Sequence, residues 1–259
     1  FGPILTLTLD RFQGARSVIK CNKNSNGEVI KRLTRIYTYI FIDEIQDLAS
    51  YDLDILKLIF ESESALCMVG DPRQVTYLTH HANQHAGYRN GKIQDFIKTK
   101  CPEDICEIDT KSLRASHRNN QIICDFSSKF YPEYSKCEPC ECEECRGHTK
   151  DHQGVFLLKD EDIKEYCEKY DPQKLHYKKA KFPDLNYGAS KGLSFERVLV
   201  YPTEKIRNYL KNGNVAEIET VKAKFYVAIT RARYSVGIVC NYDDSDYIEG
   251  IEKYISEKK

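Results

Sequence analysis

The stretch IFIDEIQD, residues 40–47, decides the fold because an apolar run ends abruptly in two carboxylates. Its apolar half belongs to the run Tyr37–Ile42, which predicts a buried strand of a parallel sheet. In open α/β sheets, ligands bind beyond the carboxyl ends of the parallel strands. We therefore expect Asp43 and Glu44 at a ligand-binding edge of the sheet.

Short apolar runs alternate with amphipathic stretches on both sides of this strand, which predicts an α/β fold with a parallel sheet. The other expected strands are Ile4–Leu9, Ala65–Val69, Val155–Leu158, Arg197–Tyr201 and Val236–Cys240. The expected helices are Tyr51–Glu61, Ile93–Lys98, Gln121–Phe130, Asp162–Tyr170 and Thr220–Ala232. We expect one domain over residues 1–100, a second over 101–246 with a cysteine-rich insertion at about 134–153, and a tail helix within 247–259, at Tyr247–Ile255.

The composition is that of an ordinary globular protein, with 41% hydrophobic and 30% charged residues among 259. The formal net charge is zero, so any basic surface must be local. Eleven cysteines, no signal pattern and no membrane-length apolar run favour a reducing compartment, cytoplasmic or nuclear. The sequence begins at Phe1 and its one methionine is Met68, so we expect a fragment or a processed product.

Two adjacent carboxylates at a strand end suit phosphoryl transfer. Asp43 can hold the water shell of Mg²⁺, and Glu44 can orient the attacking water. The alternative interpretation is an acidic helix start, where such side chains satisfy free backbone N–H groups. The sequence around the pair decides between the two.

Four further blocks follow in order: MVGDPRQVTY (68–77), LRASHRN (113–119), YGASKGLSF (187–195) and YVAITRAR (226–233). Together with DEIQD (43–47) they resemble motifs II to VI of the superfamily 1 helicases of the UvrD/Rep/PcrA type, and TLTLDRF (6–12) loosely resembles the TxHSF segment of that family. The resemblance implies two RecA-like P-loop NTPase lobes, the first incomplete. It also implies ATP and Mg²⁺ as cofactors and single-stranded DNA, rather than RNA, as partner, with 3′→5′ movement.

The resemblance also implies roles for individual residues. Gln74 would sense the terminal phosphate, and Arg118 and Arg231 would reach it as arginine fingers. A surface salt bridge is the alternative for each arginine. Besides Asp43, the remaining residues implied at the nucleotide are Asp71, Lys191 and Gly192.

Tyr77 takes the place of an aromatic residue that stacks on bases in this family. A core tyrosine is the alternative, since the chain has 18 tyrosines. The basic run around Lys178 and Lys179 could follow a phosphate backbone or be a plain solvated charge run. Arg73 and Thr230 complete the predicted nucleic-acid contacts.

Several family features are absent from the sequence. It has no Gly-x4-Gly-Lys-[Ser/Thr] loop, so we expect that loop upstream of Phe1 and this fragment alone to be inactive. The alternative is a degenerate core that does not hydrolyse ATP. The span from Arg118 to Lys191 is too short for the large accessory insertion of UvrD and Rep, which predicts a compact core. Ser194 and Gly188 replace the glutamate and histidine of the family.

Four cysteines crowd into the pattern Cys137-x2-Cys140-x-Cys142-x2-Cys145, followed by His148 and His152. Cys-x2-Cys units chelate tetrahedral zinc, so we expect a structural Zn²⁺ site. Two units this close together favour a mixed set that adds His148, His152, or the Cys101 and Cys106 pair. A reduced acidic loop and an iron–sulfur site are the alternatives.

These features predict an ATP-dependent helicase or translocase core. A second hypothesis is a DNA-stimulated ATPase or sensing subunit that regulates a nuclease or another effector protein without unwinding. A third is a scaffold that binds no nucleotide. No membrane partner is expected.

Overall fold

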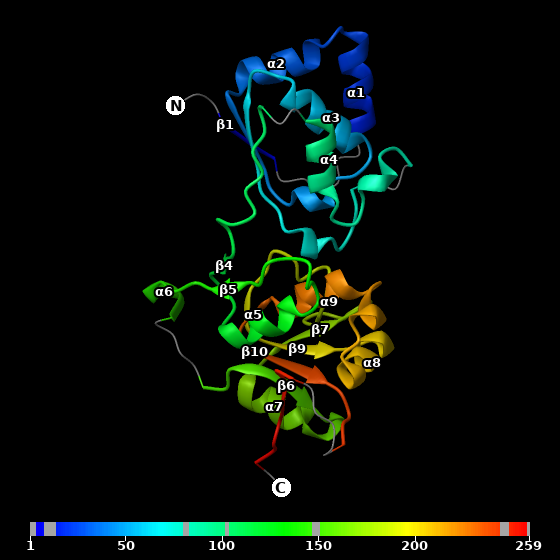
Figure 1. The fold of residues 1–259 in the computed structure, drawn as a ribbon. Helices are drawn as coiled ribbons and strands as arrows, with labels where there is room; N and C mark the ends of the chain where they lie inside the picture. The colour runs from blue at the N-terminus through cyan, green and yellow to red at the C-terminus, as the bar shows by residue number, and fades with distance from the viewer. Residues whose placement is uncertain are drawn as a thin grey trace. The chain divides into compact units, whose positions relative to one another are not determined.

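The computed structural model describes residues 4–7, 14–79, 83–101, 104–146, 151–243 and 249–257 (Figure 1). The chain divides into two compact units, Phe1–Ile108 and Asp109–Lys259. The first unit ends at Ile108, eight residues beyond residue 100, within the range 99–110 where the sequence favours a boundary. Among the described residues, no helix is both long enough and apolar enough to span a membrane.

Unit 1 is built on a three-stranded parallel sheet in the order β1-β2-β3. Its strands are β1 (Ile4–Leu7), β2 (Tyr39–Ile42) and β3 (Ala65–Met68). Its helices are α1 (Ala15–Asn24), α2 (Glu28–Ile36), α3 (Tyr51–Phe60) and α4 (Ile93–Lys100). The register places Ile42 opposite Met68, so β2 and β3 end side by side.

One face of β2 forms the core of unit 1. Ile40 and Ile42 are buried against apolar residues of α3 and α4, among them Leu53 and Phe96. The alternate residues of the strand, including Phe41, are exposed. The predicted strand is confirmed, but its burial is limited to the face that carries the isoleucines, which packs against α3 and α4.

Unit 2 contains a six-stranded parallel sheet in the order β11-β6-β10-β9-β7-β8. Its strands are β6 (Gly154–Leu158), β7 (Gln173–His176), β8 (Leu185–Asn186), β9 (Phe195–Tyr201), β10 (Ala232–Val239) and β11 (Glu252–Lys253). Its main helices are α5 (Gln121–Ser128), α7 (Ile163–Tyr170), α8 (Glu204–Asn212) and α9 (Lys222–Ile229). The predicted α/β fold with a parallel sheet is confirmed.

Both faces of this second sheet are covered (Figure 1). Along β6, Val155 and Leu157 pack into one apolar cluster with residues of α5, α8 and α9. Phe156 and Leu158 pack on the opposite face with Tyr166 of α7. This alternation follows from the two-residue period of a strand, and all five residues of β6 are buried. The continuous apolar run therefore marks a central strand.

Two predicted elements of unit 2 are wrong in type or extent. The expected tail helix at Tyr247–Ile255 is not helical over its described part, because Glu252–Lys253 pair with β6 as edge strand β11. Tyr254 is buried while Ile255 is 82% exposed, an alternation that suits an extended chain. The expected helix Thr220–Ala232 ends at Ile229, since Ala232 already begins β10.

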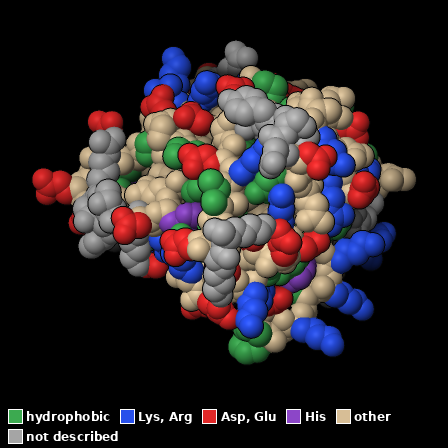
Figure 2. All heavy atoms as spheres, turned by 90° about the horizontal axis from the view of Figure 1, so that it is seen from below, with side chains coloured by type: hydrophobic (Ala, Val, Ile, Leu, Met, Phe, Trp, Pro, Cys, Tyr) green, Lys and Arg blue, Asp and Glu red, His purple; other side chains and the backbone are tan. Residues whose placement is uncertain are grey.

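The surface carries charges of both signs. On the face drawn in Figure 2, lysine and arginine side chains are intermixed with aspartate and glutamate side chains. This mixture agrees with the zero formal net charge of the chain. Electrostatic recognition therefore has to come from particular side chains rather than from the bulk charge.

Candidate nucleotide and metal sites

The acidic pair lies where the sequence places it, directly after β2. Asp43 is exposed and Glu44 is half-buried. The backbone of Glu44 is left-handed, with φ of 55°, an uncommon conformation that clusters at functional sites. A three-residue 3₁₀ turn, Ile45–Asp47, follows, but the Glu44 side chain at its N-cap position does not cap it. The interpretation of the pair as a simple helix start is therefore not supported.

Gln46 joins the acidic pair to the loop after β3. Its amide Nε2 donates to Glu44 Oε2 at 2.5 Å, and its Oε1 accepts from the backbone N–H of Asp71 at 3.0 Å. The side chain is 2% exposed, so these bonds form away from water. Gln46 was not among the predicted site residues, although its place in the DEIQD box was the available signal.

The loop after β3 is ordered around Asp71. Its Oδ1 accepts from Arg73 Nε at 2.8 Å, and its Oδ2 accepts from Gln74 Nε2 at 3.0 Å. We call Glu44, Gln46, Asp71, Arg73 and Gln74 the carboxylate network. The network brings together the predicted residues of two motif blocks at one edge of the sheet.

Gly70 allows the two loops to approach each other. A Cβ atom at this position would lie 2.4 Å from Gln46 Oε1 and 2.8 Å from Ile45 Cγ1. Any larger residue must therefore displace the buried amide that links the two blocks. The glycine of the GDPRQ block is thus required by packing.

Tyr77 is 44% exposed, so the alternative of a core tyrosine is wrong. The segment that carries it is anchored to the acidic loop, since the Thr79 N–H donates to Asp47 O at 3.0 Å. Arg73 is turned toward Asp71, and its side chain is 18% exposed. Contacts of Tyr77 and Arg73 with nucleic acid stay predictions.

In unit 2, three distant segments meet at Arg118. Its Nε donates to Ser194 Oγ at 2.6 Å and its Nη1 donates to Thr230 O at 3.1 Å. The neighbouring Asn119 donates from Nδ2 to Thr230 O at 3.1 Å and to Ala232 O at 2.7 Å. We call Arg118, Asn119, Ser194, Thr230 and Arg231 the arginine junction. It unites the three motif blocks of this unit.

Both acceptors of the Arg118 guanidinium, a hydroxyl and a carbonyl, are neutral. Burial, and secondly the charge of Arg233, lower the pKa of the Arg118 guanidinium. Ser194 stands where the family has a glutamate, and here its hydroxyl accepts from Arg118. This contact was not predicted from the sequence.

Arg231 is 2% exposed and is held by its own unit. Its Nε donates to Val227 O at 3.1 Å and its Nη1 donates to Leu193 O at 3.3 Å. A surface salt bridge is therefore wrong for Arg231. Its expected contact with a terminal phosphate stays a prediction.

Thr230 is 5% exposed, and its hydroxyl donates to Tyr226 O at 2.9 Å. The predicted contact of this side chain with nucleic acid is therefore not supported, because the hydroxyl is turned into the unit. Lys178 and Lys179 are exposed in the loop after β7, where such a contact stays a prediction.

Lys191 and Gly192 form a tight turn before β9. The Lys191 N–H donates to Gly188 O at 3.2 Å, and Gly192 has φ of 81°, a left-handed conformation that favours glycine. The next residue, Leu193, offers the carbonyl that holds Arg231. The turn is thus connected to the arginine junction through the hydrogen bond from Arg231 to Leu193 O.

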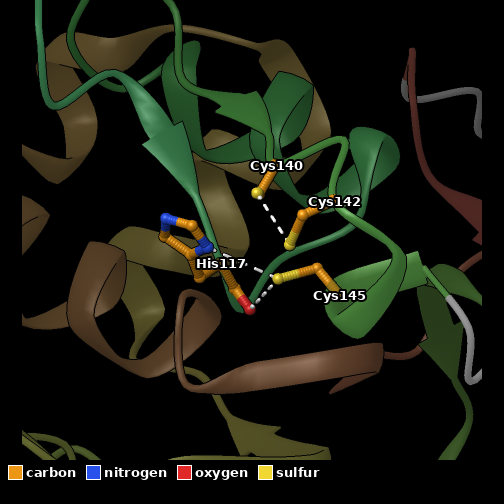
Figure 3. A group of neighbouring side chains, drawn as sticks. All are labelled: His117, Cys140, Cys142 and Cys145. Carbon is orange, nitrogen blue, oxygen red and sulfur yellow. Dashed lines mark hydrogen bonds between the residues drawn. The ribbon is translucent and has the colours of Figure 1, made fainter.

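Three of the four clustered cysteines converge with a histidine that was not predicted as a ligand (Figure 3). The candidate ligand atoms of His117, Cys140, Cys142 and Cys145 all lie within 4.8 Å of one another. A hydrogen bond from Cys140 lowers the pKa of the Cys142 thiol to about 7. The only signal for His117 was its place in the LRASHRN block, far from the cysteines in sequence.

The other predicted metal ligands lie elsewhere. Cys137 Sγ is 3.7 Å from Cys124 Sγ and is not part of this group. His148 lies outside the described residues. His152 is stacked between Phe156 and Tyr170 at ring-centroid distances of 4.0 Å. Cys101 and Cys106 belong to unit 1.

Residues 12–100 match the UvrD/REP helicase N-terminal domain family, and no curated protein matches the chain. A structure of the PRRSV helicase is 18% identical, with 78% of this chain covered, 35% of that chain covered and a TM-score of 0.46. A structure of arterivirus nonstructural protein 10 (helicase) is 14% identical, with 94% of this chain covered, 54% of that chain covered and a TM-score of 0.50. A structure of arterivirus nonstructural protein 10 (helicase) in complex with DNA is 14% identical, with 92% of this chain covered, 60% of that chain covered and a TM-score of 0.48.

The chain thus spans about one third to three fifths of the length of these similar structures. At 14% identity, the likeness to the arterivirus protein at a TM-score of 0.50 shows a shared fold. The family match covers the DEIQD and GDPRQVTY blocks, which form the carboxylate network. The match over residues 12–100 supports the recognition from the motifs, since this part of the chain is similar to the N-terminal domain of the UvrD/REP helicases.

Proposed function

We propose that the full-length protein hydrolyses ATP and couples this reaction to 3′→5′ movement along single-stranded DNA. The observation that carries the proposal is the carboxylate network, in which Gln46 links Glu44 directly to the Asp71 loop. Such a link suits an enzyme that must connect water activation with the sensing of the bound nucleotide. The arginine junction of unit 2 supports the same function.

The residues after β2 fit a magnesium nucleotide. Asp43 presents an exposed carboxylate, an oxygen ligand of the kind that Mg²⁺ prefers, and would hold the water shell of the ion. Bound Mg²⁺ would neutralise charge on the phosphates. Glu44 would accept the proton of the attacking water, while Gln46 holds its carboxylate in place.

Arginine side chains would supply the remaining positive charge. The guanidinium of Arg118 can bind two phosphate oxygens at once, and its present partners are a hydroxyl and a carbonyl rather than carboxylates. Asp71 would hold Gln74 toward the terminal phosphate. Lys191 and Gly192 would complete the nucleotide contacts through the turn that carries Leu193.

The test is ATP hydrolysis by the full-length protein, measured with and without single-stranded DNA, together with a strand-displacement assay. We expect turnover that rises on addition of DNA, and displacement of a strand from a substrate with a 3′ single-stranded tail. Turnover without displacement would favour a sensing subunit that regulates an effector. Absence of both nucleotide binding and turnover would contradict the proposal and favour a scaffold. Substituting single-stranded RNA for DNA tests the choice of nucleic acid.

A further inference from the structure

The cysteine-rich segment reaches back to the loop that carries Arg118. Strand β5 (Glu138–Pro139) pairs in parallel with β4 (Ala115–Ser116), with Ser116 opposite Pro139. His117 and Cys140 are the next residues along these two strands. The Cys140 N–H donates to Ser116 O at 2.8 Å, so the backbone fixes the histidine and the cysteine side by side.

A short turn brings in the other two cysteines. Helix α6 (Glu143–Arg146) follows Cys142, and the Cys145 N–H donates to Cys142 O at 3.1 Å. Cys145 Sγ then lies 3.4 Å from His117 Nδ1, and Cys140 Sγ lies 3.3 Å from Cys142 Sγ. Figure 3 shows the three sulfur atoms facing a common space beside the imidazole.

We infer that His117, Cys140, Cys142 and Cys145 form a mononuclear zinc site that fastens the cysteine-rich segment to the Arg118 loop. A tetrahedral site with Zn–S bonds of about 2.3 Å has sulfur–sulfur edges of about 3.8 Å. The four ligand atoms, all within 4.8 Å of one another, match that size. Three thiolates and one imidazole are a usual structural zinc set.

The compactness of the group argues against the other metal centres. An iron–sulfur cluster holds its cysteines around several metal atoms, so its ligand atoms must lie further apart than those around one ion. Four protein ligands also leave no open coordination position for a substrate. The site is therefore structural rather than catalytic.

Zinc bound at His117 would also affect the arginine junction, because the two groups are adjacent in the chain. His117 directly precedes Arg118, whose guanidinium contacts Ser194 and Thr230. A metal bond at His117 would restrict the backbone immediately before this arginine. The inference does not depend on the proposed function, because metal binding requires neither nucleotide nor nucleic acid.

The test is the metal content of the purified chain after dialysis, measured by inductively coupled plasma mass spectrometry. We expect one zinc per chain, and a fall well below half that value in Cys145→Ser and in His117→Ala. Cys137→Ser is the matched control, since Cys137 lies in the same segment but outside the group, and it should retain one zinc. Circular dichroism of each variant checks that it is folded.

If the ligand variants do not fold, cobalt binding to the wild-type chain provides a second test of the zinc site. Cobalt titration of the metal-free wild-type chain should give d–d and thiolate charge-transfer bands that saturate at one equivalent. Saturation without thiolate bands, iron with acid-labile sulfide, a disulfide among these cysteines, or loss of zinc in Cys137→Ser to the same extent as in Cys145→Ser would overturn the site.

The fastening role has its own measurement. Removal of zinc should increase hydrogen exchange at the amides of Glu138 and Cys140, which donate to Arg114 O and Ser116 O. Exchange in the central strand β10 should stay unchanged. Equal exchange of the Glu138 and Cys140 amides with and without zinc would show that the ion does not hold these segments together.

Discussion

The carboxylate network of unit 1 and the arginine junction of unit 2 are assembled in different ways. The link from Gln46 to Asp71 spans 25 positions and joins the loops after two adjacent strands. The contact from Arg118 to Thr230 spans 112 positions and ends on a backbone carbonyl. The first cluster follows from the order of strands in one sheet, whereas the second exists only when unit 2 has folded as a whole.

The largest expected effect comes from breaking the arginine junction with Arg118→Lys. The guanidinium contacts Ser194 and Thr230 through two nitrogens, and one ammonium cannot reproduce both contacts. ATP turnover of the full-length protein should fall by about 10³-fold, the scale of a lost arginine finger. Arg207→Lys, at an exposed site paired with Glu204, is the control and should leave turnover unchanged. Turnover of the Arg118 variant within twofold of wild type would contradict the role.

The corresponding break in unit 1 is Gly70→Ala. The new Cβ would clash with the Gln46 amide and with Ile45, so we expect a loss of about 3 kcal/mol in the free energy of unfolding. Chemical denaturation measures this loss. Gly87→Ala is the matched control, because a Cβ there meets nothing within 4 Å. Equal stabilities of the two variants would show that the loops are not closely packed.

The carboxylate network was largely predictable from sequence. Asp43 and Glu44 end an apolar strand, and Gly70 and Asp71 end the next, so the parallel sheet alone brings them together. The role of Gln46 was not predicted because a glutamine in a short motif does not reveal which backbone group it will bond.

The metal group and the arginine junction were less predictable. His117 joins the cysteines only because two-residue strands β4 and β5 pair, and strands this short have no periodicity in sequence. Ser194 contacts Arg118 over 76 positions. The prediction of a helical tail was wrong because the tail pairs with the edge of the sheet through its backbone. The Tyr254 N–H, for example, donates to Leu157 O at 2.9 Å.

A smaller loss of stability is expected in unit 2 when Asn119, a member of the arginine junction, is replaced by alanine. Asn119 is 8% exposed, and Asn119→Ala would leave the carbonyls of Thr230 and Ala232 without its two donated bonds. We expect a loss of about 2 kcal/mol in the free energy of unfolding from the two lost hydrogen bonds, while Thr230 O keeps the bond from Arg118 Nη1. Asn212→Ala, at an exposed site, should change stability by less than about 0.5 kcal/mol. A similar loss in both variants would argue against the junction.

The smallest expected effect concerns His152, which belongs to neither the carboxylate network nor the arginine junction. Burial, followed by the charges of Arg197 and Lys169, lowers the pKa of His152 from 6.5 to about 4. The folded state therefore favours the neutral ring, and unfolding takes up a proton between these values. Stability contributed by the neutral ring is present above pH 6.5 and is lost as the pH falls toward 4.

His152→Phe keeps an aromatic ring between Phe156 and Tyr170 but cannot titrate. The free energy of unfolding of this variant should depend less steeply on pH between 6.5 and 4 than that of the wild type. Urea denaturation at a series of pH values measures both slopes. Identical slopes would show that the imidazole does not titrate in this way.

We propose that the acidic pair after β2 performs the catalysis, and Glu44→Gln tests this role most directly. The measurement is DNA-stimulated ATP turnover of the full-length protein, with Glu61→Gln as a control at an exposed site that pairs with Lys57. Removal of the base should lower turnover by roughly 100-fold or more, with ATP binding retained, while the control stays at the wild-type rate. Turnover by Glu44→Gln within twofold of wild type would contradict a catalytic role of this carboxylate.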